Sequence, residues 1–287
     1  MPTRVRKAVF PVAGLGTRLL PATKSIPKEM VTIVDRPLIQ YAVDEAREAG
    51  IEELIFVTGR GKSALVDYFD QAFELEAMLK EKGKSLDVLA PSNAKFGEVV
   101  TVRQQQPLGL GHAVWCARHI VGDEPFAVLL PDELMVGKPN CLAQMVEAYE
   151  KVGGSIVAAL EVPESETHKY GVIDPGATDG GRLTEIRGMV EKPAPGTAPS
   201  NLMLPGRYIL QPEVMRELDS IEAGAGGEIQ LTDAIGKLVG RQPLNAYRFE
   251  GERYDCGSAT GFVIANLALA LRRNDVEPAV RDFLRNS

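Results

Sequence analysis

The sequence has few cysteines, no long apolar run and no excess of positive charge. Its 287 residues include three cysteines, Cys116, Cys141 and Cys256, which lie far apart and lack the spacing of metal ligands. The chain therefore indicates neither a disulfide framework nor a zinc site, and it favours a reducing compartment, the cytoplasm. No uninterrupted apolar run approaches the ~20 residues that cross a bilayer, and we recognise no leader peptide. The net charge of −7 disfavours nonspecific binding to nucleic acid. We therefore expect neither a membrane nor a nucleic acid as a partner.

The positive charge that is present gathers at the start of the chain. Residues 1–30 hold six Lys or Arg side chains and one acid, Glu29, although the whole chain is acidic. The apolar run at 9–12 is typical of a central strand in a parallel sheet that is covered on both faces. Gly14 and Gly16 follow, and glycine permits backbone conformations in which several N–H groups turn toward one anion. The segment predicts a buried strand followed by a stiff cationic loop that binds phosphate.

Two better-known phosphate motifs fit this sequence less well. The dinucleotide fingerprint G-x-G-x-x-G would need a third glycine where Leu19 stands. A P-loop that ends at residues 61–63 would need a glycine in place of Phe56. The sequence therefore favours neither a dinucleotide-dependent oxidoreductase nor an ATPase. A basic loop that is only a solvated turn stays open as an interpretation at this point.

The rest of the chain alternates strands and helices. We expect strands at 53–58, 99–103, 125–130, 155–162, 171–173, 183–190, 201–210 and 244–249. We expect helices at 37–49, 62–82, 110–120, 212–221, 230–239, 259–273 and 276–285. The links at 174–181 and 193–200 are rich in glycine and proline and are expected to be surface loops. The alternation is typical of a doubly wound α/β fold with a right-handed first crossover, and the short strands after residue 153 predict a mixed sheet.

Several later positions carry side chains suited to a phosphorylated ligand. Asp132 directly follows an apolar strand, where its carboxylate can bind Mg²⁺ or cap a helix. The amide of Gln106 can read the edge of a pyrimidine or cap a turn. Glu191 and Lys192 end a strand, and they are either ligand contacts or an exposed charge pair. His112 is interpreted as packing or capping and not as a general base.

The pattern G-x-G-T-R-L-x-P-x-T-K-x-x-P-K-E, from Gly14 to Glu29, resembles the signature of sugar-1-phosphate nucleotidyltransferases. Further matches span nearly the whole chain: QPLGLGHA at 106–113, LPD at 130–132, VEKP at 190–193, GEIQLTD at 227–233 and YDCG at 254–257. The chain departs from commoner members at 258–260, where a basic residue is frequent. Within the family, the pattern is most similar to members that use UTP and glucose 1-phosphate.

The resemblance implies a Rossmann-like doubly wound mixed sheet of the nucleotide-diphospho-sugar transferase type, with a smaller β-rich sugar-side region. It implies one nucleotidyltransferase domain over 1–287. Within that domain we expect a nucleotide-binding half at 1–152, a sugar-binding half at 153–257 and C-terminal helices at 258–287 that are candidates for oligomer contacts. A homo-oligomer, a tetramer, is expected by the same resemblance.

The resemblance also implies roles for individual residues. The residues implied in nucleotide binding are Ala13, Gly14, Gly16, Thr17, Gln106 and Gly111. The sugar phosphate would be bound by Gly171, Glu191 and Lys192, and Mg²⁺ by Asp132 and Asp255. The catalytic residues would be Arg18, Lys28 and Lys192. Glu228 and Asp233 would either support the sugar pocket or cap a helix.

The implied reaction converts UTP and glucose 1-phosphate to UDP-glucose and pyrophosphate. The sugar phosphate would attack the α-phosphorus of UTP in line, with Mg²⁺ assisting. Two alternatives are a thymidylyltransferase that makes dTDP-glucose and a noncatalytic sugar-nucleotide sensor.

Overall fold

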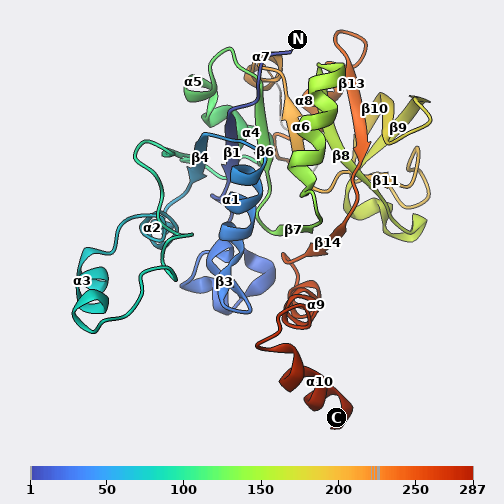
Figure 1. The fold of residues 1–287 in the computed structure, drawn as a ribbon. Helices are drawn as coiled ribbons and strands as arrows, with labels where there is room; N and C mark the ends of the chain where they lie inside the picture. Colours follow the sequence, from blue (N-terminus) through green and yellow to red (C-terminus); the bar gives the residue numbers. More distant parts are fainter. Residues whose placement is uncertain (1, 221, 223, 225–226, 287) are drawn as a thin grey trace.

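The protein is described by a computed structural model over residues 2–220, 222, 224 and 227–286 (Figure 1). Within these residues, one mixed sheet has the strand order β11-β9-β10-β13-β8-β12-β6-β1-β4-β5. Its strands are β1 (Lys7–Pro11), β4 (Glu53–Thr58), β5 (Val99–Arg103), β6 (Phe126–Leu129), β8 (Ser155–Glu161), β9 (Gly171–Thr178), β10 (Leu183–Glu191), β11 (Leu202–Met203), β12 (Arg207–Leu210) and β13 (Leu244–Arg248). The predicted doubly wound mixed sheet is confirmed.

Helices cover both faces of this sheet, and their bounds follow. They are α1 (Leu38–Glu48), α2 (Ser63–Asp67), α3 (Phe73–Glu81), α4 (Leu110–Cys116), α5 (Arg118–Val121), α6 (Cys141–Val152), α7 (Glu213–Asp219), α8 (Leu231–Gly236), α9 (Ala259–Ala270) and α10 (Glu277–Asn286). In Figure 1, α1 and α6 lie in front of the sheet, and α9 and α10 extend away from it toward the C terminus. No helix in the described part of the chain is long and apolar enough to cross a membrane.

The central strand β1 is buried because its apolar side chains alternate between two cores. It pairs in parallel with β4 on one side and β6 on the other. Phe10 belongs to the core that includes side chains of α1 and α6, whereas Val9 belongs to the core that includes side chains of α4, α7 and α8. Since successive strand residues point to opposite faces, an all-apolar strand is required here.

The two halves of the sheet meet where β12 runs antiparallel to β6, with Tyr208 opposite Val128. A smaller ladder pairs β7 (Glu133–Val136) with β14 (Glu252–Asp255). Neither of these short strands was expected from the sequence, and nor was the hairpin of β2 (Thr32–Ile33) and β3 (Arg36–Pro37). The β7–β14 ladder matters most, since it brings residues near 255 to the end of β6.

Four element predictions were wrong in detail. The predicted strand at 201–210 is two strands, β11 and β12. Residues 62–82 form two helices, α2 and α3, because Phe69 turns inward between them and packs on Phe56 with ring centroids 5.2 Å apart. The predicted helix at 110–120 breaks at Ala117 into α4 and α5. The predicted loop at 174–181 is strand up to Thr178, because β9 and β10 absorb Pro175 and Gly176 through shifts of register. The helix α6, which Asn140 caps, was not expected.

Candidate active site

A cleft lies beyond the carboxyl end of β1, and its volume is about 530 Å³. Seven of the residues expected to bind the nucleotide, the phosphates or the metal line it: Ala13, Gly14, Gly16, Thr17, Arg18, Lys28 and Asp132. Because β1 and β6 are parallel neighbours, the loop after β1 and the segment after β6 reach the same edge of the sheet. The cleft is therefore the candidate active site.

The glycine loop folds back so that Lys28 enters the cleft. Gly16 has a φ of +67°, which glycine adopts without strain, and it begins a short 3₁₀ turn, η1 (Thr17–Leu19). A Cβ on Gly16 would lie 2.9 Å from the Cβ of Lys28, so a larger residue would collide with the lysine. The hydroxyl of Thr23 donates to the carbonyl of Gly16 at 2.7 Å and closes the loop. The residues of the predicted cationic loop therefore form a closed turn at the edge of the cleft.

Lys28 and Asp132 form the central ion pair of the cleft. The Nζ of Lys28 lies 2.6 Å from Oδ2 of Asp132, and Nη2 of Arg18 lies 3.9 Å from the same oxygen. Burial disfavours both charges, but attraction by Asp132 raises the pKa of Lys28, and attraction by Lys28 lowers the pKa of Asp132. Both groups are therefore charged at neutral pH. The Arg18 side chain is 65% exposed and has room to turn toward an incoming anion.

Asp255 reaches the same place from the far end of the chain. The β7–β14 ladder sets Asp255 opposite Glu133, the residue after Asp132. The N–H of Cys256 donates to the carbonyl of Asp132 at 2.9 Å, which fixes the two segments together. Burial, with the neighbouring charges of Asp132 and Asp255, raises the pKa of Glu133 to about 7, even though Arg253 donates to it at 2.7 Å. Carboxylates thus concentrate beside the ion pair.

The carboxylates suit a hard cation that takes its other ligands from phosphate and water. In the described part of the chain, no three His, Cys, Asp or Glu side chains group as a complete metal site. Mg²⁺ does not need one, since it usually binds one or two carboxylates together with substrate phosphates and water. Asp132 has a lowered pKa and lines the cleft, so it meets this requirement directly. Asp255 does not line the cleft itself but lies beside it, opposite Glu133 in the β7–β14 ladder.

Gly257 leaves the space that Arg18 occupies. A Cβ on Gly257 would lie 2.6 Å from Nη2 of Arg18 and 3.1 Å from Oδ1 of Asp255. The N–H of Gly257 also donates to that Asp255 oxygen at 3.0 Å. The glycine of the Tyr-Asp-Cys-Gly motif therefore serves the site by its lack of a side chain.

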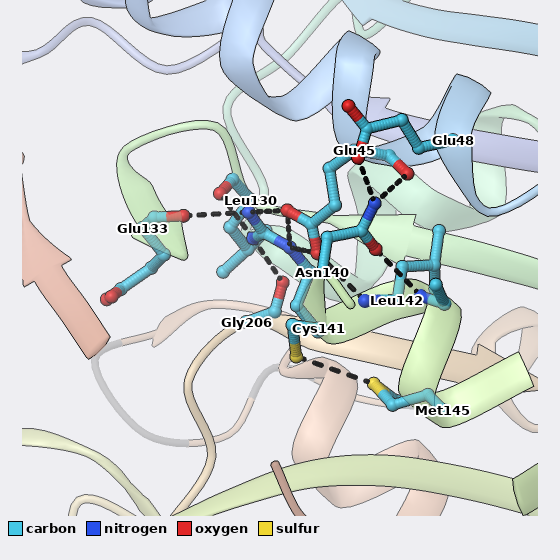
Figure 2. Close-up of polar contacts among 11 residues, drawn as sticks. Glu45, Glu48, Leu130, Glu133, Asn140, Cys141, Leu142, Met145 and Gly206 are labelled. Atoms are coloured by element: carbon cyan, nitrogen blue, oxygen red, sulfur yellow. Dashed lines mark hydrogen bonds and ion pairs between the residues drawn. The ribbon is translucent and has the colours of Figure 1, made fainter. Parts of the chain in front are cut away.

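A buried ion pair, which sequence reasoning missed, holds the segment that carries Asp132. Arg207 on β12 donates to both carboxylate oxygens of Glu45 on α1, at 2.8 to 3.1 Å. It also donates to the carbonyls of Leu130 and Glu133, at 2.9 and 2.8 Å, on either side of Asp132. Figure 2 shows Glu45, Leu130 and Glu133 converging on this point. A buried arginine could not have been distinguished from an exposed one in the sequence, because its partner is 162 positions away.

Two of the residues expected to bind the nucleotide, Gln106 and Gly111, do not line the cleft. Gln106 is exposed and does not line the cleft, whereas Gln104, the first residue after β5, does. Gly111 is buried, and its N–H donates to the carbonyl of Ile229 at 2.8 Å. It is therefore a packing glycine, and Gly109 lines the cleft in its place. The strand end at Arg103 was the signal that could have pointed to Gln104.

The expected sugar residues form a neighbouring group that does not line the cleft. The Thr232 hydroxyl donates to Glu191 at 2.8 Å, and a Cβ on Gly171 would lie 2.9 Å from Oε2 of Glu191. Lys192 has a φ of +47°, and its Nζ lies 3.8 Å from Oε1 of Glu191. Its side chain is 55% exposed. The structure thus brings Gly171, Glu191 and Lys192 together. Glu228, whose role the sequence left open, lines the cleft itself.

Arg253 connects the residues expected to bind the sugar to the carboxylate of Glu133. Its guanidinium lies over the ring of Tyr170, 4.9 Å from the centroid, and it pairs with Glu133. Tyr170 directly precedes Gly171, and its carbonyl accepts from the N–H of Lys192 at 3.0 Å.

A larger cavity, of about 750 Å³, lies between α2 and β5 but contains none of the expected site residues. Size alone therefore does not identify the site.

Comparisons with known proteins show the family to which the chain belongs. A family model described as nucleotidyl transferase matches residues 7–271. The chain is 52% identical over 256 residues to a UTP–glucose-1-phosphate uridylyltransferase of Komagataeibacter xylinus, covering 88% of this chain and 90% of that protein. It is 50% identical over 282 residues to the enzyme of the same name from Bacillus subtilis, covering 98% and 96%.

Solved structures give the same result. A UTP-bound UGPase from Acinetobacter baumannii is similar with a TM-score of 0.89 and 44% identity, over 98% of each chain. A UDP-glucose pyrophosphorylase complexed with UDP-glucose is similar with a TM-score of 0.85 and 46% identity, over 94% of this chain and 100% of that one. A putative glucose-1-phosphate thymidylyltransferase from Bacillus anthracis, at 22% identity and a TM-score of 0.73, shares the fold.

Proposed function

The chain belongs to the nucleotidyl transferase family, and we propose that it joins UTP and glucose 1-phosphate to give UDP-glucose and pyrophosphate. The observation that carries this proposal is 50% identity, over 98% of the chain, to a uridylyltransferase with that reaction in its name. The cleft supports it, because a glycine loop, two cations and an aspartate meet where a nucleoside triphosphate would need them. The thymidylyltransferase is the weaker candidate, since at 22% identity it shares only the fold.

The chemistry requires positioning and neutralisation of charge more than proton transfer. A phosphate oxygen of glucose 1-phosphate attacks the α-phosphorus of UTP in line, the bond to the β-phosphate oxygen breaks, and pyrophosphate leaves with that electron pair. The nucleophile is already an anion, so no general base is needed. Arg18 and Lys28 hold the triphosphate and the departing pyrophosphate. Lys192 holds the sugar phosphate, and Glu191 and Gly171 hold the sugar.

Lys28 is engaged with Asp132 until ligands arrive. When the triphosphate binds, Lys28 can turn from the carboxylate to the phosphates, which leaves Asp132 available to a cation. We infer that Mg²⁺ is held by Asp132 and Asp255, and that it supplies positive charge to the phosphate oxygens. Gly14, Gly16 and the neighbouring Ala13 and Thr17 give the triphosphate a close approach to the backbone.

On the base side, we assign recognition of uracil to Gln104 and Gly109. They line the cleft and thereby take the place that the sequence suggested for Gln106 and Gly111.

The chain is proposed to form one domain of two halves, 1–152 and 153–257, with the helices at 258–287 as oligomer contacts. The continuous sheet supports a single unit. We also propose that the protein is a homotetramer and that it is cytoplasmic. The free cysteines at 116, 141 and 256 support the reducing compartment.

The reaction is tested by release of pyrophosphate from each of the four nucleoside triphosphates with several sugar 1-phosphates. We expect the combination of UTP and glucose 1-phosphate to be the best substrate pair. Strong preference for dTTP would favour the thymidylyl reaction. Tight binding of UDP-glucose without any turnover would favour a sensor. Sedimentation of the same preparation measures the oligomer size.

A further inference from the structure

The carboxamide of Gln104 is held from one side by two acceptors. Its Nε2 donates to the carbonyl of Gly109 at 3.0 Å and to Nδ1 of His112 at 3.1 Å. A carboxamide nitrogen has two N–H groups, so both donors are used. No described residue donates to Oε1 of Gln104, and Gln104 lines the cleft. The side chain therefore offers the cleft an acceptor and no donor.

The hydrogen bond also fixes the state of His112. Because an amide nitrogen only donates, Nδ1 of His112 must accept, and the ring is neutral with its proton on Nε2. The ring stacks on Trp115 with centroids 5.7 Å apart, and Sγ of Cys116 lies 4.0 Å from Nδ1. Of the described charged groups, Arg118 lies over the Trp115 ring and acts on His112, and Asp219 on α7 accepts from Nε1 of Trp115 at 3.1 Å. Burial and the charge of Arg118 lower the pKa of His112 and keep the ring neutral at physiological pH.

We propose that His112 is a positioning residue that sets the base preference of the enzyme by fixing the orientation of the Gln104 carboxamide. This inference rests on the proposed uridylyl transfer. Uracil presents an N3–H donor, which pairs with an acceptor, whereas cytosine presents an unprotonated N3 to the same place. Two acceptors then face each other, and the unpaired polar groups disfavour cytosine.

Rotation of the amide would reverse this pattern. With the NH₂ group turned to the cleft, Gln104 would donate to N3 of cytosine, but its Oε1 would then oppose the carbonyl of Gly109 and Nδ1 of His112. His112 thus supplies one of two acceptors that hold the uracil-selective orientation. Thymine has the same N3–H as uracil, so the device distinguishes UTP and dTTP from CTP but not from each other.

The test compares kcat/KM for UTP with kcat/KM for CTP, each with glucose 1-phosphate, in three variants. His112→Phe keeps a flat ring against Trp115 but removes the acceptor, and it should lower the UTP-to-CTP ratio about fivefold, the worth of one hydrogen bond. His112→Asn replaces the acceptor with a carbonyl and should restore the ratio. His119→Phe, at an exposed histidine that does not line the cleft, is the control and should leave the ratio unchanged.

A pH series adds a readout that simple packing would not change. As the pH falls through the lowered pKa of His112, Nδ1 gains a proton and becomes a donor, so the wild-type ratio should fall. In His112→Phe the ratio should stay level at every pH above the range in which the N3 of cytosine itself gains a proton, since effects of pH on phosphates and metal are common to both nucleotides. If His112→Phe does not fold, the dependence of the wild-type UTP-to-CTP ratio on pH tests the role of His112.

A folded His112→Phe with an unchanged ratio, or a wild-type ratio that does not respond to acid, would overturn the role of His112. In either case, uridylyl transfer by the wild type would still stand. Failure of the wild type to release pyrophosphate from UTP would instead contradict the proposed function, and the positioning role with it.

Discussion

At the scale of single residues, function depends on where charge and empty space are placed. Arg18 and Lys28 come from one loop but differ in setting, because Lys28 is largely buried against Asp132 whereas Arg18 is mostly exposed. Gly16 and Gly257 matter for what they lack, since a Cβ at either would collide with one of these cations. Three predictions belong at this scale.

Arg18→Ala and Lys28→Ala should each lower turnover by about 10²–10³, because a fixed positive charge is lost where negative charge develops. Steady-state release of pyrophosphate measures the effect, with circular dichroism to check the fold. Lys24→Ala is the matched control, since Lys24 lies exposed in the same loop and does not line the cleft. Equal losses in all three variants would indicate a general effect of charge and contradict the assigned roles.

Gln104→Ala should raise the KM for UTP and weaken discrimination among nucleotides, because the base would lose its partner in the cleft. Gln106→Ala should change neither, since that side chain is exposed outside the cleft. Kinetics with UTP, CTP and dTTP distinguish the two variants. The reverse outcome would return base recognition to Gln106.

Gly257→Ala should reduce turnover while the protein stays folded. The new methyl group would meet the end of the flexible Arg18 side chain, which can move away at little cost in stability but then leaves its position. Gly236→Ala, in the last position of α8, has no atom within 4 Å of its new Cβ and serves as the control. Thermal unfolding and turnover are measured together. Loss of stability without loss of turnover would exclude this role for Gly257.

At the scale of elements, short strands and one buried ion pair bring distant segments to the cleft. The β7–β14 ladder carries Asp255 to the end of β6, and Arg207 connects β12 and α1 to the carbonyls around Asp132. Glu45 accepts in addition from the N–H of Leu142 at the start of α6. Helices α1 and α6 are thereby joined to the segment that holds Asp132.

Glu45→Gln should lower the free energy of unfolding by about 3–5 kcal/mol, because Arg207 would be left as an uncompensated buried charge. The Arg207 side chain is only 1% exposed, so solvent cannot replace the lost partner. Urea denaturation provides the measurement. The double variant Glu45→Leu with Arg207→Met should recover much of the loss, since no charge would remain buried. A single variant as stable as the wild type would refute the importance of this pair.

At the scale of the whole molecule, the candidate metal ligands come from the two halves of the chain. Asp132 follows β6 in the first half, and Asp255 ends β14, near residue 258 where the C-terminal helices begin. Helix α9 packs beside β14 and β2, so this helix adjoins the strand that carries Asp255. The complete site therefore needs the whole fold.

EDTA should abolish turnover, and added Mg²⁺ should restore it, because bare phosphates would otherwise repel each other. Asp132→Asn should lose most of the metal-dependent rate, since an amide is a weaker Mg²⁺ ligand than a carboxylate, and Asp255→Asn should do likewise. A titration of rate against Mg²⁺ concentration measures the effect. Full activity in EDTA would exclude a metal at both residues.

The sequence by itself determined the parts that depend on neighbours along the chain. The apolar run of β1, the glycine and lysine pattern after it and the strand end before Asp132 are local signals, and β4 and β5 have the predicted bounds. Only the tertiary structure decided that Gln104 and not Gln106 lines the cleft, that Gly111 packs on Ile229, and that Arg207 is buried against Glu45. The physical reason is that burial, and the direction in which a loop side chain points, depend on contacts between segments far apart in sequence, which local patterns do not contain.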